Sequence, residues 1–389
     1  MSELLNGRWA ETKEALLEGL QGTKKSVMGV TLENTRKYLV ESPTAGATSA
    51  GNVATLNRVI LPVIRRVMPT VIANELVGVQ PMTGPVGQIH TLRVRYADNS
   101  SGAGVVAGEE ALSPFKIAEA YSGNQNSGNA KAASTASLEG AAGNRMSIQI
   151  LKQTVEAKTR KLSARWTFEA AQDAQAQQGI DIEAEVMAAL AQEITAEIDQ
   201  EILASLASLA GNATEIFDQA AVSGTATFVG DEHAALAVQI NRVANLIAQR
   251  TRRGAGNWAV VSPFALTILQ SATTSAFART TEGTFEAPTN TKFVGTLNNA
   301  MKVYVNTYAQ DTADVLIGYK GASESDAAAF YCPYIPLMSS GVVLDPSTFE
   351  PVVSFMTRYG YVELSNTASS LGNAADYLGK VSIQNVSFK

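Results

Sequence analysis

The most constraining feature of this sequence is a row of apolar residues that recurs at every fourth position. The row consists of Ile182, Val186, Leu190, Ile194, Ile198, Ile202 and Leu206. Each four-residue step overshoots a full helical turn by about 40°, so a row of this length winds roughly two thirds of the way round a straight helix. Such a helix cannot bury its row against one flat surface. It is expected either as one member of a helical bundle or as a spine, about 40 Å long, that crosses a thin, extended domain.

The residues before this helix predict how it begins. Asp181 occupies a position where an N-cap residue is favoured, and Glu183 and Glu185 lie where the positive end of the helix dipole favours negative charge. Upstream, residues 161–169 alternate between polar and apolar side chains, which indicates a strand with one buried face. A short helix over 169–178 is expected between this strand and the long helix.

A second informative stretch, residues 97–147, is rich in Gly, Ala, Ser and Asn and has few large apolar residues. It cannot supply a core of its own, and a loop of this length inside a compact domain is normally functional or disordered. The flanking strands, predicted at 88–96 and 161–168, are expected to pair as the base of a long, exposed hairpin. A disordered insertion is the alternative, and composition alone favours it.

The second half of the chain alternates helices and strands. One helix is predicted over 233–252 and another from Ser262–Pro263 onward, because Ser is a favoured N-cap and Pro suits the first helical turn. Strands are predicted at 258–261, 301–307, 314–319, 328–335, 352–364 and 380–388. The first four complete an α/β unit over about 230–340, and the last two return to the first domain, which is therefore discontinuous. A chain of 389 residues is long enough for two such units.

Charge and composition exclude several classes of function. The net charge of −6 argues against nucleic-acid binding as the main role, because neutralising phosphates requires clustered Lys and Arg. No segment approaches the roughly 18 consecutive apolar residues of a membrane-spanning helix, and the first residues lack the apolar core of a signal peptide. Cys332 is the single cysteine, which leaves no internal disulfide and fits a reducing compartment.

Residues that carry catalytic chemistry are sparse. With His90, His233 and Cys332 as the only imidazoles and thiol, a zinc site would need carboxylates at most positions. The sequence has no nucleophile elbow and no glycine loop of a phosphate-binding type. His233 is interpreted as a helix-start residue, and Glu193 and Glu197 as a solvated or interface face of the long helix. We therefore expect no enzyme and no catalytic, cofactor-binding or metal site.

One basic cluster has two interpretations. Arg250, Arg252 and Arg253 end the helix predicted over 233–252 and precede Gly254, a combination that suits a helix C-terminus. In the first interpretation, which we favour, the three arginines are simply the charged end of a helix. The alternative is a contact with a phosphate or with a carboxylate of a neighbouring molecule, which makes the three arginines candidates for intersubunit contacts.

Several stretches resemble the major capsid proteins of T-even-like tailed phages, and they occur in the same order as in that family. They are VGVQPMTGPVGQIHTLRVRY (77–96), VEAKTRKLSARWTFEAAQDAQAQQGIDIEAE (155–185), EITAEIDQEI (193–202), QRTRRGAGNWAVVSP (249–263), VLIGYKG (315–321), FYCPYIPL (330–337) and FMTRYGY (355–361). Each stretch alone is weak, whereas seven in order are specific, and together they cover roughly residues 55–365.

The resemblance implies an α+β fold, the Hong Kong-type fold of tailed-phage capsids and encapsulins. Its parts would be an N-terminal leader (1–41), an N-terminal arm (42–70), a first part of the peripheral domain (71–96), an extended loop (97–165), the peripheral domain with the spine helix (166–229), an axial domain (230–340) and a peripheral return (341–389). The extended loop would reach a neighbouring subunit. A folded insertion that the T-even relatives carry in this loop is replaced here by a short segment of low complexity.

The function implied by the resemblance is structural. The chain would assemble as hexamers, with pentamers left open, into an icosahedral shell that encloses double-stranded DNA without sequence-specific binding. Expected partners are further copies of the chain, a scaffold, a prohead protease, and portal, vertex or decoration proteins. No cofactor and no membrane are expected. The implied location is the virion capsid, preceded by the host cytoplasm. The alternatives are a vertex protein of the same family and an encapsulin-like compartment shell, and an enzyme of unknown type is the least favoured.

The resemblance also implies removal of a leader after a glutamate that is preceded, two positions earlier, by Leu or Ile. Leu39-Val40-Glu41 and Leu16-Leu17-Glu18 both match this pattern. Glu41 is preferred to Glu18 because the small, polar, Pro- and Gly-containing residues 42–54 follow it. Such a segment is expected to be an extended linker that a protease can reach.

Overall fold

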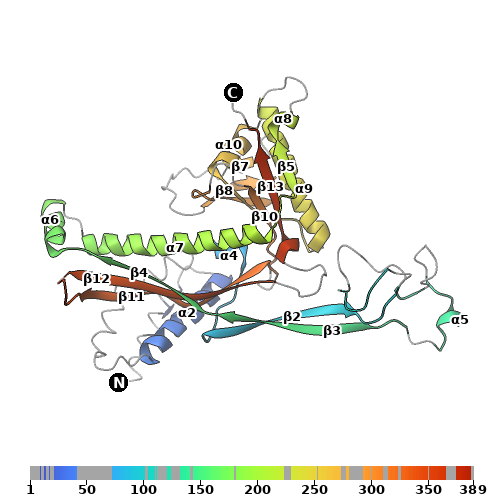
Figure 1. Cartoon of the computed structure of the whole chain (residues 1–389), viewed down its shortest axis with the longest axis horizontal. Coiled ribbons are helices and arrows are strands. Elements are labelled where there is room, and N and C mark those ends of the chain that lie inside the picture. Colours follow the sequence, from blue (N-terminus) through green and yellow to red (C-terminus); the bar gives the residue numbers. More distant parts are fainter. Residues whose placement is uncertain are drawn as a thin grey trace.

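The structure is a computed structural model that describes most of the chain. It describes Trp9, Lys13, Glu14, Leu17, Ala111 and residues 22–41, 72–100, 104–109, 121–123, 132–140, 143–178, 181–222, 229–251, 253–272, 277–279, 292–298, 300–309, 314–322, 326–348, 350–364 and 374–386. Figure 1 shows a long helix above a narrow sheet, a second sheet at the end of that helix, and a hairpin that projects beyond both.

The expected spine helix is α7 (Ile182–Leu209), and it begins as the sequence predicts. The Asp181 carboxylate accepts a hydrogen bond from the backbone N–H of Glu183 at 3.0 Å. The apolar row is buried from Leu190 to Leu206. Figure 1 shows α7 running along the four-stranded sheet, with its C-terminal end at the seven-stranded sheet. The row winds because the helix meets these two neighbours, so the spine interpretation is confirmed and the helical-bundle alternative is wrong.

The four-stranded sheet has the order β1-β11-β12-β4. Its strands are β1 (Gly78–Val79), β4 (Lys158–Arg165), β11 (Ala329–Leu344) and β12 (Pro351–Glu363). All neighbours are antiparallel except the short pair β1 and β11. Along β12 buried and half-buried residues alternate, and Val353, Phe355 and Tyr359 join the core that includes the apolar row of α7.

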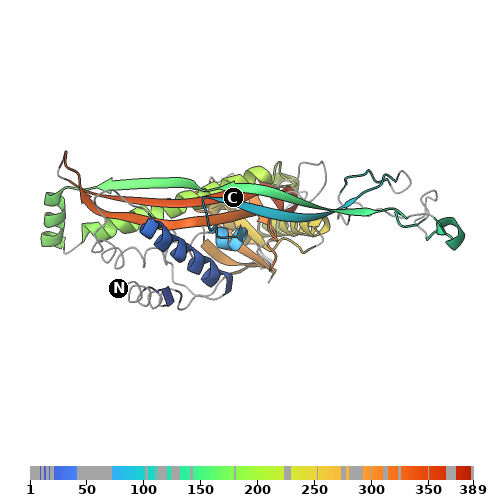
Figure 2. The same cartoon turned by 90° about the horizontal axis from the view of Figure 1, so that it is seen from below.

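Helix α2 (Gly22–Glu41) lies beside β11, as Figure 2 shows from below. Its Met28 and Leu32 are buried in the same core as the apolar row of α7. The Asn34 side-chain amide donates to two backbone carbonyls, those of Met82 at 2.7 Å and Tyr334 at 3.0 Å. The described part of the expected leader (1–41) therefore contributes to the core of the subunit.

The seven-stranded sheet has the order β5-β13-β10-β6-β9-β8-β7. Its strands are β5 (Glu215–Asp218), β6 (Trp258–Val261), β7 (Phe277–Arg279), β8 (Lys292–Leu297), β9 (Met301–Val305), β10 (Val315–Gly318) and β13 (Leu378–Gln384). Helices α9 (Val229–Thr251) and α10 (Pro263–Ser271) share one core with this sheet. Both helices are confirmed, and Ser262 caps α10 by accepting from Ala265 N at 3.2 Å.

Two predicted strands belong to the other sheet. The strand predicted at 328–335 within the α/β unit is the start of β11, which pairs with β12 in the four-stranded sheet. The strand predicted at 380–388 within the first domain is β13, which lies between β5 and β10 in the seven-stranded sheet. Both assignments were wrong because alternating burial identifies a strand and its buried face but does not identify the strand beside it.

The predicted hairpin exists with a different second strand. Strand β2 (Val86–Tyr96) pairs with β3 (Met146–Glu156), from Val86 opposite Glu156 to Tyr96 opposite Met146. The expected pairing of 88–96 with 161–168 is wrong, because residues 158–165 form β4 and pair with β12. A single residue, Ala157, separates β3 from β4, so the alternating pattern seen at 161–169 is the second part of a longer extended segment.

The remaining described elements are short. They are α4 (Ala73–Leu76), α5 (Thr135–Leu138), α6 (Phe168–Gln178), α8 (Gln219–Val222) and the 3-10 helix η1 (Ala374–Tyr377). At the start of the segment 97–147, Val105, Ala111 and Tyr121 pack with Tyr96 in a small apolar cluster. The expectation that this segment has no core of its own therefore needs correction at this one place, where the aromatic ring of Tyr121 packs against that of Tyr96 in a tilted arrangement.

Candidate assembly surfaces

The projecting hairpin presents an apolar row to solvent. Alternate residues of a strand point to one face, so Met146, Ile148 and Ile150 of β3 lie on the same side of the hairpin. Their side chains are 52%, 69% and 66% exposed. Single exposed apolar residues are ordinary, but a contiguous row on a projecting element is typical of a surface that another molecule covers.

The base of the hairpin is held firmly by the body of the subunit. Met82, Val155, Phe330 and Cys332 form a buried cluster there. The Gln153 side-chain amide donates to the backbone carbonyl of Glu363 at 3.2 Å, which fastens β3 to the end of β12. Cys332 is a core residue, as expected, and burial raises the pKa of its thiol to about 12. These contacts anchor the base of the hairpin to the body of the subunit.

A charged cluster ties β4 to α7. The Arg160 guanidinium donates to Glu197 at 2.6 Å, to Glu201, and to the hydroxyl of Tyr359 at 2.6 Å. Burial acts to lower the pKa of Arg160, but its hydrogen bonds with Glu201 and Tyr359 outweigh that effect and raise it. Burial acts to raise the pKa of Glu201, whereas the hydrogen bonds from Arg160 and Tyr359 lower it on balance. Arg160 and Glu201 therefore keep their opposite charges near neutral pH.

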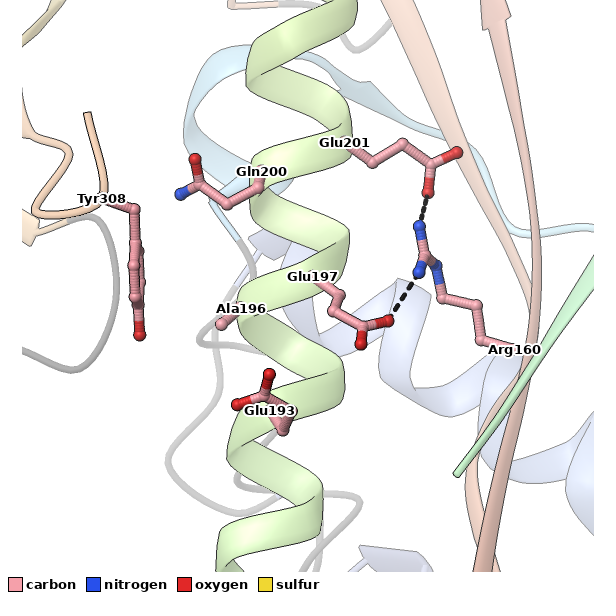
Figure 3. Close-up of a pocket in the computed structure, with 7 residues that line it drawn as sticks. All are labelled: Arg160, Glu193, Ala196, Glu197, Gln200, Glu201 and Tyr308. Carbon is pink, nitrogen blue, oxygen red and sulfur yellow. Dashed lines mark hydrogen bonds and ion pairs between the residues drawn. The ribbon is translucent and has the colours of Figure 1, made fainter. Parts of the chain in front are cut away.

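A hollow of about 490 Å³ opens beside this cluster. Figure 3 shows the ring of Tyr308, from the loop after β9, on the side of α7 that carries Gln200, whereas Glu197 and Glu201 point the other way, toward Arg160. The lining includes Arg160, Glu193, Glu197, Gln200, Glu201 and Tyr308. Gln200 is held in place because its amide exchanges hydrogen bonds with that of Asn306, at 2.9 and 3.1 Å. The expected pair Glu193 and Glu197 thus lies on an open face of the helix.

The three arginines considered for intersubunit contact are not shown as one patch. Arg253 forms an ion pair with Asp326 at 2.7 Å inside its own subunit. Tyr319 adds a second tie at this point by donating from its hydroxyl to the Arg253 carbonyl at 3.3 Å. Arg250 is half-buried in the last turn of α9, and Arg252 lies outside the described residues. The contact made by Arg253 supports the charged-helix-end interpretation for that residue.

The two candidate leader-cleavage residues differ in what the structure describes. Glu41 is the last residue of α2, so the chain up to that point is helical. Glu18 lies outside the described residues, as does the expected linker at 42–54. A protease that needs an extended chain would therefore require the last turn of α2 to unwind.

Sequence reasoning missed one buried carboxylate, that of Asp199 on α7. The residue is 1% exposed, and its Oδ1 accepts a hydrogen bond from the backbone N–H of Ile72 at 2.9 Å. Burial raises its pKa to about 7, against the opposing effect of this hydrogen bond. The available signal was its helical position, since Asp199 lies four residues after Thr195 and four before Leu203 on a second buried row.

His233 is placed at the start of α9, as interpreted from the sequence. Its Nδ1 lies 2.5 Å from the hydroxyl of Ser271, and burial lowers its pKa despite the nearby charge of Glu232. Among the described residues, no group of His, Cys, Asp or Glu is arranged to hold a metal ion. The helices that the structure describes include none long and apolar enough to cross a membrane.

Comparison with known proteins places the chain in a family. A family model described as "Major capsid protein Gp23" matches residues 53–383. The major capsid protein of Vibrio phage KVP40 is 29% identical, over 85% of this chain and 81% of its own length. That of Enterobacteria phage T4 is also 29% identical, over 83% of this chain and 78% of its own length. A solved structure titled "The capsid of Myoviridae Phage XM1" has 10% identity and a TM-score of 0.44, covering 79% of this chain and 90% of that one. The family model spans most of the chain, which therefore belongs to the Gp23 family of major capsid proteins, the proteins that form the virion capsid of tailed phages.

Proposed function

We propose that copies of this chain gather as hexamers, and as pentamers at the vertices, and that these close into an icosahedral shell around double-stranded DNA. The role is structural and not enzymatic. The observation that carries the proposal is the apolar row of β3, because Met146, Ile148 and Ile150 lie on a projecting hairpin with their side chains largely exposed. Covering such a row stabilises an interface by about 25 cal/mol for each Å² of apolar surface removed from water.

The hairpin is the element that joins subunits in this proposal. It extends well beyond the two sheets at one end of the elongated subunit, as Figures 1 and 2 both show. A projection of this kind adds little to the core of its own subunit but can reach a second copy. Arg250 and Arg252 are proposed as a further contact between subunits, whereas Arg253 is held by Asp326 of its own subunit.

Sheet membership suggests how the subunit is divided. We assign the four-stranded sheet, with α7, to the peripheral domain. The axial domain is then built on the seven-stranded sheet, and it takes β5 and β13 from outside the expected range 230–340 while leaving β11 to the peripheral domain. The chain crosses between the two domains more often than the sequence predicts.

Further partners are proposed from the resemblance to the family. A prohead protease would remove the leader after Glu41, with Glu18 as the alternative, and a scaffold would guide assembly before that step. Portal, vertex or decoration proteins would complete the shell. Protein from DNA-filled particles that still begins at Met1 would exclude the cleavage.

The proposed function is tested by placing a charge in the apolar row. Ile148→Asp should leave the subunit folded, because the side chain lies outside any core of its own chain, and should abolish closed shells. Ser147→Asp is the matched control, since it adds the same charge to the other face of the same strand. Sedimentation and negative-stain images of both variants give the readout. Normal shells from Ile148→Asp, with an unchanged circular-dichroism spectrum, would contradict the proposed role of the hairpin.

A further inference from the structure

Charge is divided unequally between the strands of the hairpin region and the spine helix. Strands β2, β3 and β4 together carry seven basic residues and a single acidic one, Glu156. Helix α7 carries six acidic residues and no lysine or arginine. Within one subunit this complementarity is used where Arg160 of β4 binds Glu197 and Glu201 of α7.

The hollow beside α7 retains an acidic group that this internal contact does not use. Glu193 lies one helical turn before Glu197, is exposed, and makes no ion pair with the part of the chain that the structure describes. Across the hollow stands the ring of Tyr308, which is 56% exposed. An aromatic face opposite a carboxylate is a favourable seat for an ammonium or guanidinium group, because the ring quadrupole and the carboxylate both attract a cation.

One basic residue of the projecting hairpin is suited to this seat. Lys152 of β3 is exposed and lies on the same face as Ile150 and Ile148. It follows the apolar row by two residues, toward the base of the hairpin. It forms no ion pair among the described residues. By contrast, Arg160 is occupied by the two glutamates of its own α7, and Arg165 lies 3.8 Å from Glu350.

The geometry points to a contact between two copies of the chain, in which Lys152 of one subunit enters the hollow of the other, between Glu193 and Tyr308. This inference rests on the proposed function, in which the hairpin reaches a neighbouring copy. Contact within one subunit is disfavoured, because Glu193 precedes the end of α7 at Leu209 by 16 residues, about 24 Å of helix. The hairpin runs away beyond that end, as Figure 1 shows. The apolar row beside Lys152 would then be covered by the same neighbour.

Charge reversal tests this pairing in the full-length chain. Glu193→Lys and Lys152→Glu should each lower the yield of shells at least tenfold, because each places two like charges in one contact. The double variant, with both charges exchanged, should recover most of the yield, since the contact again joins opposite charges. Gln192→Lys is the control, because it adds a positive charge at an exposed position in the middle of α7 that does not line the hollow.

The outcomes separate this inference from the proposed function. If Ile148→Asp prevents assembly but Glu193→Lys assembles as the unchanged protein does, the hairpin joins subunits and the hollow is not its seat. If Glu193→Lys prevents assembly but Lys152→Glu does not, another cation occupies the hollow and the assignment of Lys152 is wrong. A double variant as poor as either single variant would also overturn the pairing.

A cross-linking measurement gives an independent readout. Lys152→Cys combined with Glu193→Cys should form covalent multimers when assembled protein is treated with a flexible bismaleimide, seen as a ladder under denaturing conditions. A linker of this kind is needed because the side chains of a Lys–Glu pair hold their Cβ atoms farther apart than a disulfide allows. The natural Cys332 is buried and does not compete. Each single cysteine variant is the control. Assembled protein of the double variant that remains monomeric after this treatment would contradict the contact.

Discussion

Asp199 of the spine helix accepts a hydrogen bond from the backbone N–H of Ile72 at 2.9 Å. A buried carboxyl group of α7 thus holds the backbone at the residue before α4. Its second oxygen, Oδ2, is buried without a hydrogen-bond partner in the described structure. Burial raises the pKa of Asp199 from 3.8 to about 7, because a charged carboxylate is poorly solvated there. The hydrogen bond from Ile72 opposes this shift without cancelling it.

The first prediction concerns the pH dependence of stability. The folded state holds the Asp199 proton more tightly than the unfolded state does, so the residue's contribution is greatest below its unfolded pKa, 3.8, and declines as the pH rises to about 7. The decline is at most about 4 kcal/mol at 1.36 kcal/mol per pKa unit. Asp199→Asn keeps an oxygen for the Ile72 N–H and removes the titration. The difference in unfolding free energy between the two proteins, measured in urea across this range, should therefore change with pH. A constant difference would contradict the prediction.

The second prediction concerns the clamp between β4 and α7. Arg160→Lys keeps the charge but replaces a guanidinium group by a single ammonium group. The guanidinium donates hydrogen bonds to Glu197, Glu201 and Tyr359. We expect a loss of about 1–3 kcal/mol in unfolding free energy, the range for lost hydrogen bonds to charged groups. Arg165→Lys is the control, because its contact with Glu350 is long, at 3.8 Å, and Arg165 is largely exposed. Equal losses in urea unfolding of the two variants would refute the clamp.

The third prediction concerns a close approach in the seven-stranded sheet. A Cβ atom at Gly318 would lie 2.1 Å from Cζ2 of the buried Trp258 on the neighbouring strand β6. Gly318→Ala should therefore displace the indole and lower the unfolding free energy by about 1–3 kcal/mol, as overpacking does. At Gly143 an added Cβ meets no atom within 4 Å, so Gly143→Ala is the control. Thermal unfolding followed by tryptophan fluorescence measures both, and a neutral Gly318→Ala would show that the strands can separate at this point.

The fourth prediction concerns how α2 is attached. Leu32 is fully buried, and removing a buried leucine side chain usually costs about 2–5 kcal/mol. Val27, Met28 and Thr31 are the other buried residues among the α2 side chains that the structure describes, so Leu32 is a main attachment of this helix. We therefore expect Leu32→Ala to release this helix locally while the rest of the subunit keeps its melting temperature. Limited proteolysis should then cut within residues 22–41 at least tenfold faster, because cleavage follows the population of the opened form. Lys25→Ala, at an exposed position of α2, should leave the rate unchanged, and equal rates for the two variants would exclude the local release.

Several parts of the fold follow from short-range patterns. The row from Ile182 to Leu206 predicts α7, with Asp181 as its cap, because helical periodicity and capping involve residues within a few positions of each other. Ser262 and Pro263 predict the start of α10 for the same reason. The seven stretches that resemble T-even-like major capsid proteins led to the family that the comparisons show.

Pairing and burial between distant residues required the folded chain. Nothing in the alternation at 161–169 distinguishes β12 from β2 as the neighbour of β4, because every strand presents the same row of backbone donors and acceptors along its edge. The placement of β11 and β13 in opposite sheets has the same cause. The hollow beside α7 brings Glu193 together with Tyr308, more than a hundred positions along the chain, and the buried Asp199 accepts its hydrogen bond from Ile72, 127 positions earlier. Local sequence determines which helices and strands form. Which elements become neighbours depends on contacts between distant residues, and these exist only after the two sheets have packed against α7. The charges and surfaces presented to another copy depend on the same contacts.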